Sequence, residues 1–571
     1  MNPCLRIVLL AAVLGLAQVQ FAQADSVAAR KLDSALAAVA AEDWAAAAKL
    51  YRELAADNPQ QGLFWYELGT AEYHLKNYRE SIAAYDRAIA VGQFVGTCYF
   101  NQACCFALLG EQTPAIDRLE LAIKAGLRNR ETSIREDTDL VSIRDTEEFR
   151  KRILPAPPLD ISRVDGWRMD LDYLTKRVAE THYDPWAHIS RAEWDQEIAR
   201  VSRGIPEMKD HEIIVALIQL MVRIGDGHTG LSAPRQGKFA FHMLPVTFFD
   251  FKDGLYVKAA HPDYAQLVGK RVVRVGALSA KDAMARIQTT AQRDNDQGGR
   301  WMGPRYLARI EYLDALGISD GLESVVLTVA DAKGKETRIT VKAIPFLGSS
   351  PHDTEVEPSG WIDMAPPTES PPLWRRQPDR YFTLDYLDDS KIAYANFRAV
   401  IDSPHETLAD FAGRVVPFAR DKKARVLVID VRTNNGGNNN LARPLLHAIA
   451  NSEFNEMGRL FVITGRETFS ACQNFCNWMD RQTAAIFVGE PTGSRPNFVG
   501  EGNEIILPYS GLTANASSRY WQDSYSEDRR VWIAPELEAE MTSDDYRSNR
   551  DPALAAILEY VTTRGLAAAK P

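Results

Sequence analysis

Apolar and polar positions follow different periods in successive stretches of the chain. Between residues 164 and 231, apolar side chains recur at helical spacing and predict amphipathic helices. These positions are Leu171, Leu174, Val178, Ile213, Leu217 and Leu220. Residues 239–344 alternate in short runs that predict strands, interrupted by a helix over residues 280–287. From residue 381 onward, apolar runs alternate with helical stretches, and this order predicts an α/β domain.

Three apolar runs in this last region have the continuous pattern of buried strands. They cover residues 426–431, 460–464 and 485–488, and each ends in a polar or glycine-rich turn. Ligands of such sheets bind beyond the carboxyl ends of the strands. Ser470 lies there, at the predicted start of a helix whose free N–H groups suit an oxyanion. The alternative is that Ser470 only caps the helix.

A 34-residue repeat precedes these regions. Three columns share this spacing: Tyr51, Tyr85 and Leu119; Leu54, Ala88 and Ala122; Ala47, Ser81 and Ala115. The pattern resembles tetratricopeptide repeats, paired helices with small residues where they cross. About three repeats cover residues 28–128, and residues 25–155 form the predicted repeat domain. Such arrays typically bind extended peptides or partner proteins. An unrelated helical bundle is the alternative.

The first 24 residues have the features of a signal peptide. One arginine precedes an apolar run over residues 7–19, and Ala22-Gln23-Ala24 matches the small-x-small cleavage pattern. The run is shorter than the roughly 20 residues that span a bilayer. We therefore expect an exported protein in the periplasm or outside the cell, without stable membrane insertion after cleavage. A retained anchor is the alternative.

Composition narrows the chemistry further. The 571 residues carry a formal net charge of −10, which argues against nucleic acid as a partner. Six cysteines include no CxxC pair, and the chain has no HExxH motif or phosphate-binding glycine loop. We therefore predict no metal and no cofactor. Cys472 and Cys476 are expected to be small core residues, and Arg466, Arg495 and Arg530 to be solvated surface residues.

Four motifs together resemble the tail-specific (C-terminal processing) serine peptidases of family S41. They are DVRTNNGG at residues 430–437, TFSA at 468–471, GEPTG at 489–493 and GDGHT at 225–229, the last similar to the histidine turn of the tricorn-like branch. The resemblance implies a helical segment at 160–235, a PDZ-like domain at 236–345, a proline-rich linker at 346–378 and a crotonase/ClpP-like α/β core at 379–571. A multidomain chain with an all-α repeat domain is therefore expected.

The resemblance also implies a catalytic serine, Ser470. One branch of the family pairs this serine with lysine, but no lysine lies between Lys423 and Lys570. The lysine position after Gly493 holds Ser494 and Arg495, and arginine does not act as a base in water. Histidine is the chemical alternative, and His228 on its glycine turn is the candidate.

The remaining site residues are less sharply defined. For the orienting acid we favour Asp528, with Glu527 and Glu504 as alternatives. For the oxyanion we expect an N–H from the Gly436-Gly437 turn and the N–H of Ala471. The predicted function is an exported serine endopeptidase that forms an acyl-enzyme on a polypeptide substrate, with repeats that recruit substrate or partner. The alternatives are a catalytically inactive peptide-binding scaffold and a serine esterase.

Overall fold

The computed structural model describes residues 27–127, 130–347 and 358–564. The predicted signal peptide lies outside these residues. The chain divides into two compact units. One runs to Arg177 and takes in Asn503–Thr513, and the other contains Val178–Gly502 and the residues from Ala514 onward. The domain boundaries drawn from the sequence stay predictions.

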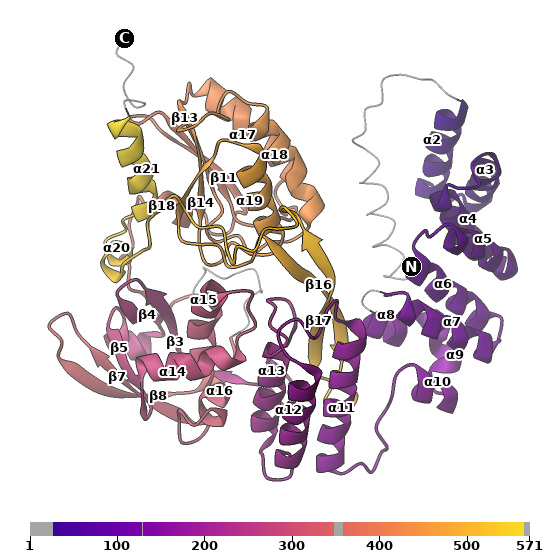
Figure 1. Ribbon diagram of the computed structural model, residues 1–571, viewed down its shortest axis with the longest axis horizontal. Helices are drawn as coiled ribbons and strands as arrows, with labels where there is room; N and C mark the ends of the chain where they lie inside the picture. Colours follow the sequence, from indigo (N-terminus) through magenta and orange to yellow (C-terminus); the bar gives the residue numbers. More distant parts are fainter. Residues whose placement is uncertain (1–26, 128–129, 348–357, 565–571) are drawn as a thin grey trace. The chain divides into compact units, whose positions relative to one another are not determined.

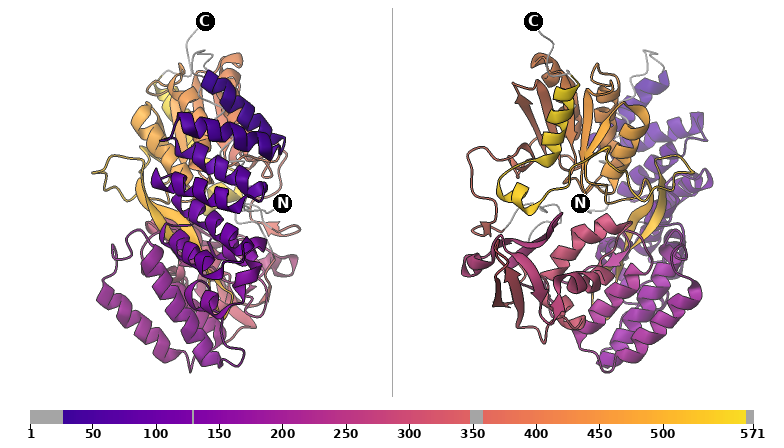
Figure 2. Two further views of the ribbon diagram at one scale, coloured as in Figure 1. Left: turned by 90° about the vertical axis from the view of Figure 1, so that its right-hand side faces the viewer. Right: turned by 60° about the vertical axis from the view of Figure 1, so that its left-hand side comes forward.

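The first unit is helical (Figure 1). Its six leading helices are α2 (Val27–Ala40), α3 (Trp44–Asp57), α4 (Gly62–His74), α5 (Tyr78–Ala90), α6 (Val95–Leu108) and α7 (Gln112–Lys124). They stack one after another, as the left view of Figure 2 shows. Shorter helices follow: α8 (Arg130–Glu136), η1 (Thr138–Leu140), α9 (Val141–Arg144) and α10 (Glu147–Arg152).

The 34-residue columns form the core of these stacked helices. All nine residues of the three columns are buried. Packing is also close beside the columns: a Cβ on Gly69 would lie 2.7 Å from the ring of Tyr85. The repeat predicted from the sequence is therefore the packing pattern of the unit.

The helix α11 (Arg163–Thr181) runs from the first unit into the second. It is followed by α12 (Arg191–Gly204) and α13 (Asp210–Val222), in agreement with the helical period of this stretch. The chain then turns through residues 225–230 into β1 (Gly230–Leu231), which pairs with β17 (Thr513–Gln522). The partner of β17 on its other side is β16 (Asn497–Ile506).

Six strands of a seven-stranded sheet lie in the region predicted to be PDZ-like, and the seventh falls within the predicted linker. Its strands are β3 (Val246–Phe251), β4 (Gly254–Ala260), β5 (Arg271–Val275), β6 (Leu278–Ser279), β7 (Ser324–Ala330), β8 (Glu336–Lys342) and β10 (Ile362–Asp363), and every pairing is antiparallel. Three helices accompany it: α14 (Ala280–Ile287), α15 (Asp296–Leu307) and α16 (Ile310–Ala315). A separate pair joins β2 (His242–Met243) and β9 (Ile344–Pro345). The PDZ-like assignment itself stays a prediction.

The α/β region contains a six-stranded sheet with the order β11-β12-β13-β14-β15-β18. The strands are β11 (Phe382–Leu387), β12 (Ile392–Phe397), β13 (Val426–Asp430), β14 (Leu460–Thr464), β15 (Ile486–Gly489) and β18 (Leu537–Glu538). Only the β11–β12 pair is antiparallel. The three strands predicted from apolar runs are thus central strands of this sheet.

Helices cover both faces of the sheet, which explains why its strands are apolar throughout. In β13, Leu427 and Ile429 pack in one core cluster with residues of α17 (Leu408–Asp421), α18 (Arg443–Ala450) and α19 (Ala471–Gln482). Val426 and Val428 point to the other cluster, with residues of α21 (Pro552–Thr563). Figure 1 shows α21 in yellow to the left of the strands and the other three helices in orange to their right. The short helix α20 (Ser543–Arg547) lies just below α21. Among the described residues, no helix combines the length and apolar character needed to cross a membrane.

Candidate active site

Ser470 lies on a strained turn between β14 and α19. Its backbone angles are φ 55° and ψ −125°, a positive φ that a residue with a side chain rarely adopts. Gly436 packs against this turn so closely that a Cβ on it would lie 2.7 Å from the Cβ of Ser470. A strained serine between a strand and a helix N-terminus is the arrangement of a nucleophile elbow. The sequence predicted the strand, the helix and the serine, but not the strain, because no Gly-x-Ser-x-Gly motif is present.

His228 is brought to Ser470 although 242 residues separate them. Its Nε2 lies 2.9 Å from the Oγ of Ser470, within hydrogen-bond distance. The imidazole is stacked between two phenyl rings, with centroids 4.6 Å from Phe469 and 5.4 Å from Phe498. The two sequence candidates for base and nucleophile therefore meet, and the rings hold the imidazole in place.

The surroundings favour the neutral form of this histidine. Burial lowers the pKa of His228 to about 4, and the charge of Asp226 and the backbone of Val499 offset this only in part. For Nε2 to accept the serine proton, the ring proton must lie on Nδ1. Nδ1 is buried and makes no hydrogen bond of ordinary geometry within the described chain.

Asp226 holds the backbone of the histidine turn. Its Oδ1 accepts hydrogen bonds from the N–H groups of His228 and Thr229, at 2.8 and 2.7 Å. The same oxygen accepts the hydroxyl of Ser517, and Oδ2 lies 2.8 Å from Nε2 of His182. Burial alone would raise the pKa of Asp226, but these hydrogen bonds and the charge of His182 lower it below its usual range. A carboxylate is therefore kept ionised next to the candidate base.

The structure does not bring the predicted acid to the histidine. Asp528 accepts hydrogen bonds from the hydroxyl of Ser524, at 2.6 Å, and from Arg530, with which it also forms an ion pair at 2.8 Å. Arg530 above all lowers the pKa of Asp528 to about 2. Among the alternatives, Glu527 bonds the hydroxyl of Ser526, and Glu504 belongs to the first unit. Among the described residues, no hydrogen bond from the His228 ring to Asp528 is present, and this carboxylate instead pairs with Arg530.

One N–H of the Gly436-Gly437 turn is left available for an oxyanion, as expected from the sequence, and the other is used inside the turn. The N–H of Gly436 donates to Oδ1 of Asn434 at 3.0 Å, inside the turn. The N–H groups of Gly437 and Ala471 have no acceptor within the part of the chain that the structure describes. Val400 fixes the turn, since its N–H donates to the Gly436 carbonyl at 2.8 Å. The pair suited to an oxyanion is therefore Gly437 with Ala471.

Two further residues contact the turns that carry His228 and Ser470, and sequence reasoning assigned neither of them to the site. Asp294 accepts a hydrogen bond from the N–H of Gly227 at 2.7 Å, and Ser494 accepts one from the N–H of Ser470 at 3.2 Å. Ser494 stands at the position where the resembling family has lysine, so that position still touches the serine. Asp294 belongs to no motif, and no sequence signal could have identified it.

The other side chains singled out from the sequence are engaged elsewhere. Cys472 and Cys476 are free thiols in the core, as expected. Two of the arginines are not the solvated surface residues predicted. Arg466 is buried and pairs with Glu490 at 2.7 Å, and Arg495 donates to the carbonyl of Asp294 at 2.8 Å.

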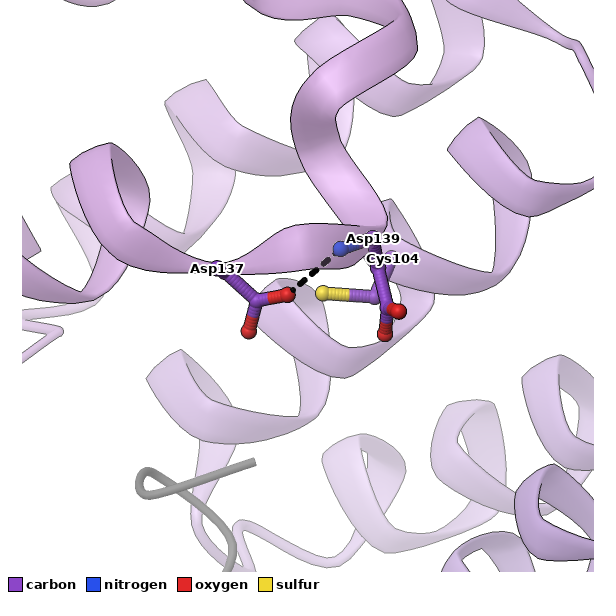
Figure 3. Close-up of side chains that lie close together, drawn as sticks. All are labelled: Cys104, Asp137 and Asp139. Atoms are coloured by element: carbon purple, nitrogen blue, oxygen red, sulfur yellow. Dashed lines mark hydrogen bonds between the residues drawn. The ribbon is translucent and has the colours of Figure 1, made fainter. Parts of the chain in front are cut away.

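Two groups of potential metal ligands occur in the described chain. One consists of Cys104, Asp137 and Asp139 in the repeat unit (Figure 3), and the other of His211, Glu212 and Asp314. Both already have protein partners: Asp137 accepts the N–H of Asp139 at 2.9 Å, and His211 lies 2.8 Å from Asp314. Neither group includes a residue of the Ser470–His228 pair.

Comparison with known proteins agrees with both units. A tetratricopeptide-repeat model matches residues 32–93, so the repeat prediction is confirmed there. The structure is similar to mature CPAF complexed with lactacystin, with 12% identity, a TM-score of 0.50, and coverage of 71% of this chain and 99% of that one. No relative matches among the curated proteins.

Two further solved structures overlap less well. The photosystem II D1 C-terminal processing protease has 10% identity and a TM-score of 0.34, with 71% of this chain and 98% of that chain covered. A Bacteroides fragilis protein named as an S41 protease has 13% identity and a TM-score of 0.30, with 59% and 85% covered. At these identities, the likeness to CPAF describes the fold alone.

Proposed function

We propose that the chain is a serine peptidase in which Ser470 is the nucleophile and His228 the base. The observation that carries this proposal is the 2.9 Å contact between Nε2 and Oγ, made by a serine on a strained turn at a helix N-terminus. The named proteases among the structural neighbours and the four sequence motifs support the same reaction class. As part of this proposal, the seven-stranded sheet is assigned to a PDZ-like domain and the six-stranded sheet to a crotonase-like core.

In the proposed reaction, Nε2 of His228 takes the serine proton as Oγ attacks the peptide carbonyl. The N–H groups of Gly437 and Ala471 stabilise the oxyanion of the tetrahedral intermediate. The protonated histidine then gives its proton to the leaving amine, and an acyl-enzyme remains. Water, deprotonated by the same nitrogen, hydrolyses the ester. The charge of Asp226 stabilises the imidazolium, since it is the carboxylate whose charge raises the pKa of the ring.

Labelling with a fluorophosphonate probe tests this assignment. We expect the mature protein to be labelled on Ser470, with labelling abolished in Ser470→Ala and slowed by several orders of magnitude in His228→Ala. Ser526→Ala removes an exposed serine of the same unit and serves as the control that keeps full labelling. An unlabelled wild-type protein would identify an inactive scaffold of this fold. Comparison of peptide with ester substrates separates a peptidase from an esterase.

We further propose that the repeats recruit protein substrates or partners and that the chain is exported. Deletion of residues 25–155 should leave hydrolysis of short peptides intact and weaken action on folded proteins, since no proposed catalytic residue lies there. Equal losses on both substrates would contradict this role. N-terminal sequencing of the exported protein should begin at or near Asp25, and a start at Met1 would contradict the signal peptide.

A further inference from the structure

Asp294 is a buried carboxylate beside the histidine turn. Only 4% of the residue is exposed, and its Oδ1 accepts the N–H of Gly227, the residue before His228. Space at this contact is tight: a Cβ on Gly227 would lie 3.2 Å from Oδ1 of Asp294 and 2.7 Å from the ring of Phe469. The turn is therefore confined between this carboxylate and the ring that stacks on the histidine.

Together with Asp226, this carboxylate fixes three successive backbone groups. The N–H of Gly227 bonds Asp294, and the N–H groups of His228 and Thr229 bond Asp226. Because three consecutive N–H groups are hydrogen-bonded, the backbone at His228 has little freedom to move and its side chain leaves the turn in a fixed direction. The direction of the His228 ring is thus set by the fixed main chain of its turn together with the two stacked phenyl rings.

Asp294 also reaches the nucleophile's side of the site. Ser494 is fully buried, and its Oγ accepts the N–H of Ser470. The hydroxyl of Ser494 stabilises the ionised form of Asp294 and lowers its pKa. Arg495 ties the two segments together, since its Nε donates to the carbonyl of Asp294 at 2.8 Å. Asp294 therefore bonds the segment before the base through its carboxylate, and the Ser494–Arg495 segment through its own backbone carbonyl.

This placement is costly for the folded protein. Burial raises the pKa of Asp294 to about 7, with a further contribution from the charge of Asp226. Its Oδ2 makes no hydrogen bond of ordinary geometry within the described chain. An amide side chain at this position would accept from Gly227 without the cost of a buried charge.

We propose that Asp294 is a positioning residue that keeps the His228 turn and the Ser470 turn in register, a role that rests on the proposed serine-peptidase function. It acts through Gly227 on one side and Ser494 on the other, and it touches neither the substrate nor the reacting atoms. The distance between Nε2 and Oγ is the quantity that it controls.

Two variants of Asp294 and one of Ser494 test this role. In Asp294→Ala we expect kcat to fall about 100-fold, as for a misplacement of about 1 Å, with KM nearly unchanged. Asp294→Asn keeps an acceptor for Gly227 and should recover most of this loss. Ser494→Ala, a small change that leaves the fold intact, should lower kcat by about tenfold. The rate of fluorophosphonate labelling should follow kcat, with Asp294→Ala the slowest of the three variants.

A matched control separates positioning from folding. Asp170 is likewise buried with a raised pKa and accepts the N–H groups of Tyr509 and Ser510, at 2.7 and 2.9 Å. Asp170→Ala should lower the melting temperature and leave kcat unchanged, whereas Asp294→Asn should not lower the melting temperature. Wild-type kcat in Asp294→Ala or in Ser494→Ala, or an Asn variant as slow as the Ala variant, would overturn the proposal.

A crystal structure of Asp294→Ala supplies a readout that does not depend on activity. The proposal requires the Nε2–Oγ contact to lengthen beyond hydrogen-bond distance, and an unchanged contact would overturn it. If wild-type protein is neither labelled nor active, the proposed peptidase function fails, but this distance still decides the role of Asp294.

Discussion

Burial lowers the pKa of His228 to about 4, so the pH at which activity is lost reports how this ring is packed. The shift from the usual 6.5 corresponds to about 3 kcal/mol against the protonated ring. A base must be neutral to accept the serine proton, so activity is lost as the pH falls through this pKa. We therefore expect kcat/KM to stay on its plateau down to about pH 5 and to halve near pH 4.

Opening the site to water should reverse this shift. Phe498→Ala removes one of the two stacked rings, so the pKa of His228 should rise toward its usual value. If it reaches about 6, roughly 10% of the variant is neutral at about pH 5, against roughly 90% of the wild type. Relative to its own plateau, the variant should thus be about tenfold slower there, and equally active at neutral pH apart from any loss of positioning.

The assay is kcat/KM for a short fluorogenic peptide across this pH range, with samples returned to neutral pH to show that acid exposure is reversible. Two carboxylates face the histidine turn, Asp226 and Asp294, and the pKa of Asp294 is raised to about 7. Asp294→Asn therefore belongs in the series. An acid limb near pH 6.5 that persists in Asp294→Asn would refute the reasoning, because the ring would then be solvated.

Three further predictions follow from the contacts of the site. Asn434→Ala should lower the free energy of unfolding by about 1–3 kcal/mol and kcat by at least tenfold, because this fully buried side chain holds the turn that presents Gly437. Urea unfolding measures the first effect and turnover the second, and Asn451→Ala, at an exposed position, is the control. Asp528→Asn should cost less than about tenfold in kcat, and a loss as large as that of the histidine variant would restore Asp528 as the orienting acid. Asp294→Asn should stabilise the protein by up to about 4 kcal/mol above pH 7 and by little near pH 4, because the penalty on the buried charge builds up as the pH rises from the usual pKa of 3.8 to the raised pKa of about 7. A melting-temperature difference between variant and wild type that is the same at both pH values would contradict this.

The strands and the meeting of Ser470 with His228 could be predicted from the sequence because each leaves a local signal. Strand β14 has the predicted bounds, because a strand covered by helices on both faces is apolar along its whole length and ends where polar residues begin. The pairing of Ser470 with His228 could be inferred because both stand in short motifs that resemble those of family S41, with His228 on a glycine-rich turn. Removing lysine from the candidates left histidine as the base.

The rest of the site could not be predicted because it is built by contacts between distant segments. Asp294 meets a backbone N–H that lies 67 residues away, and Ser494 meets one 24 residues away. Any aspartate or serine can accept such a bond, so the residue types carry no signal. Asp528 shows the opposite error. Its position in the order of motifs suggested that it orients His228, but in the structure it forms an ion pair with Arg530.

Several unfavourable features converge on one place, and this bears on whether the protein is an enzyme. Ser470 holds a positive φ, a conformation that costs of order 1–3 kcal/mol. His228 is desolvated enough to lose most of its basicity, and Asp294 is a carboxylate buried without full hydrogen bonding. A scaffold that only binds peptides needs neither the strained serine nor the buried imidazole, because glycine and an apolar ring would fill these positions at lower cost. Strain at the nucleophile, a neutral base and a fixed turn are what acyl transfer needs together, so their coincidence favours the peptidase over the inactive scaffold.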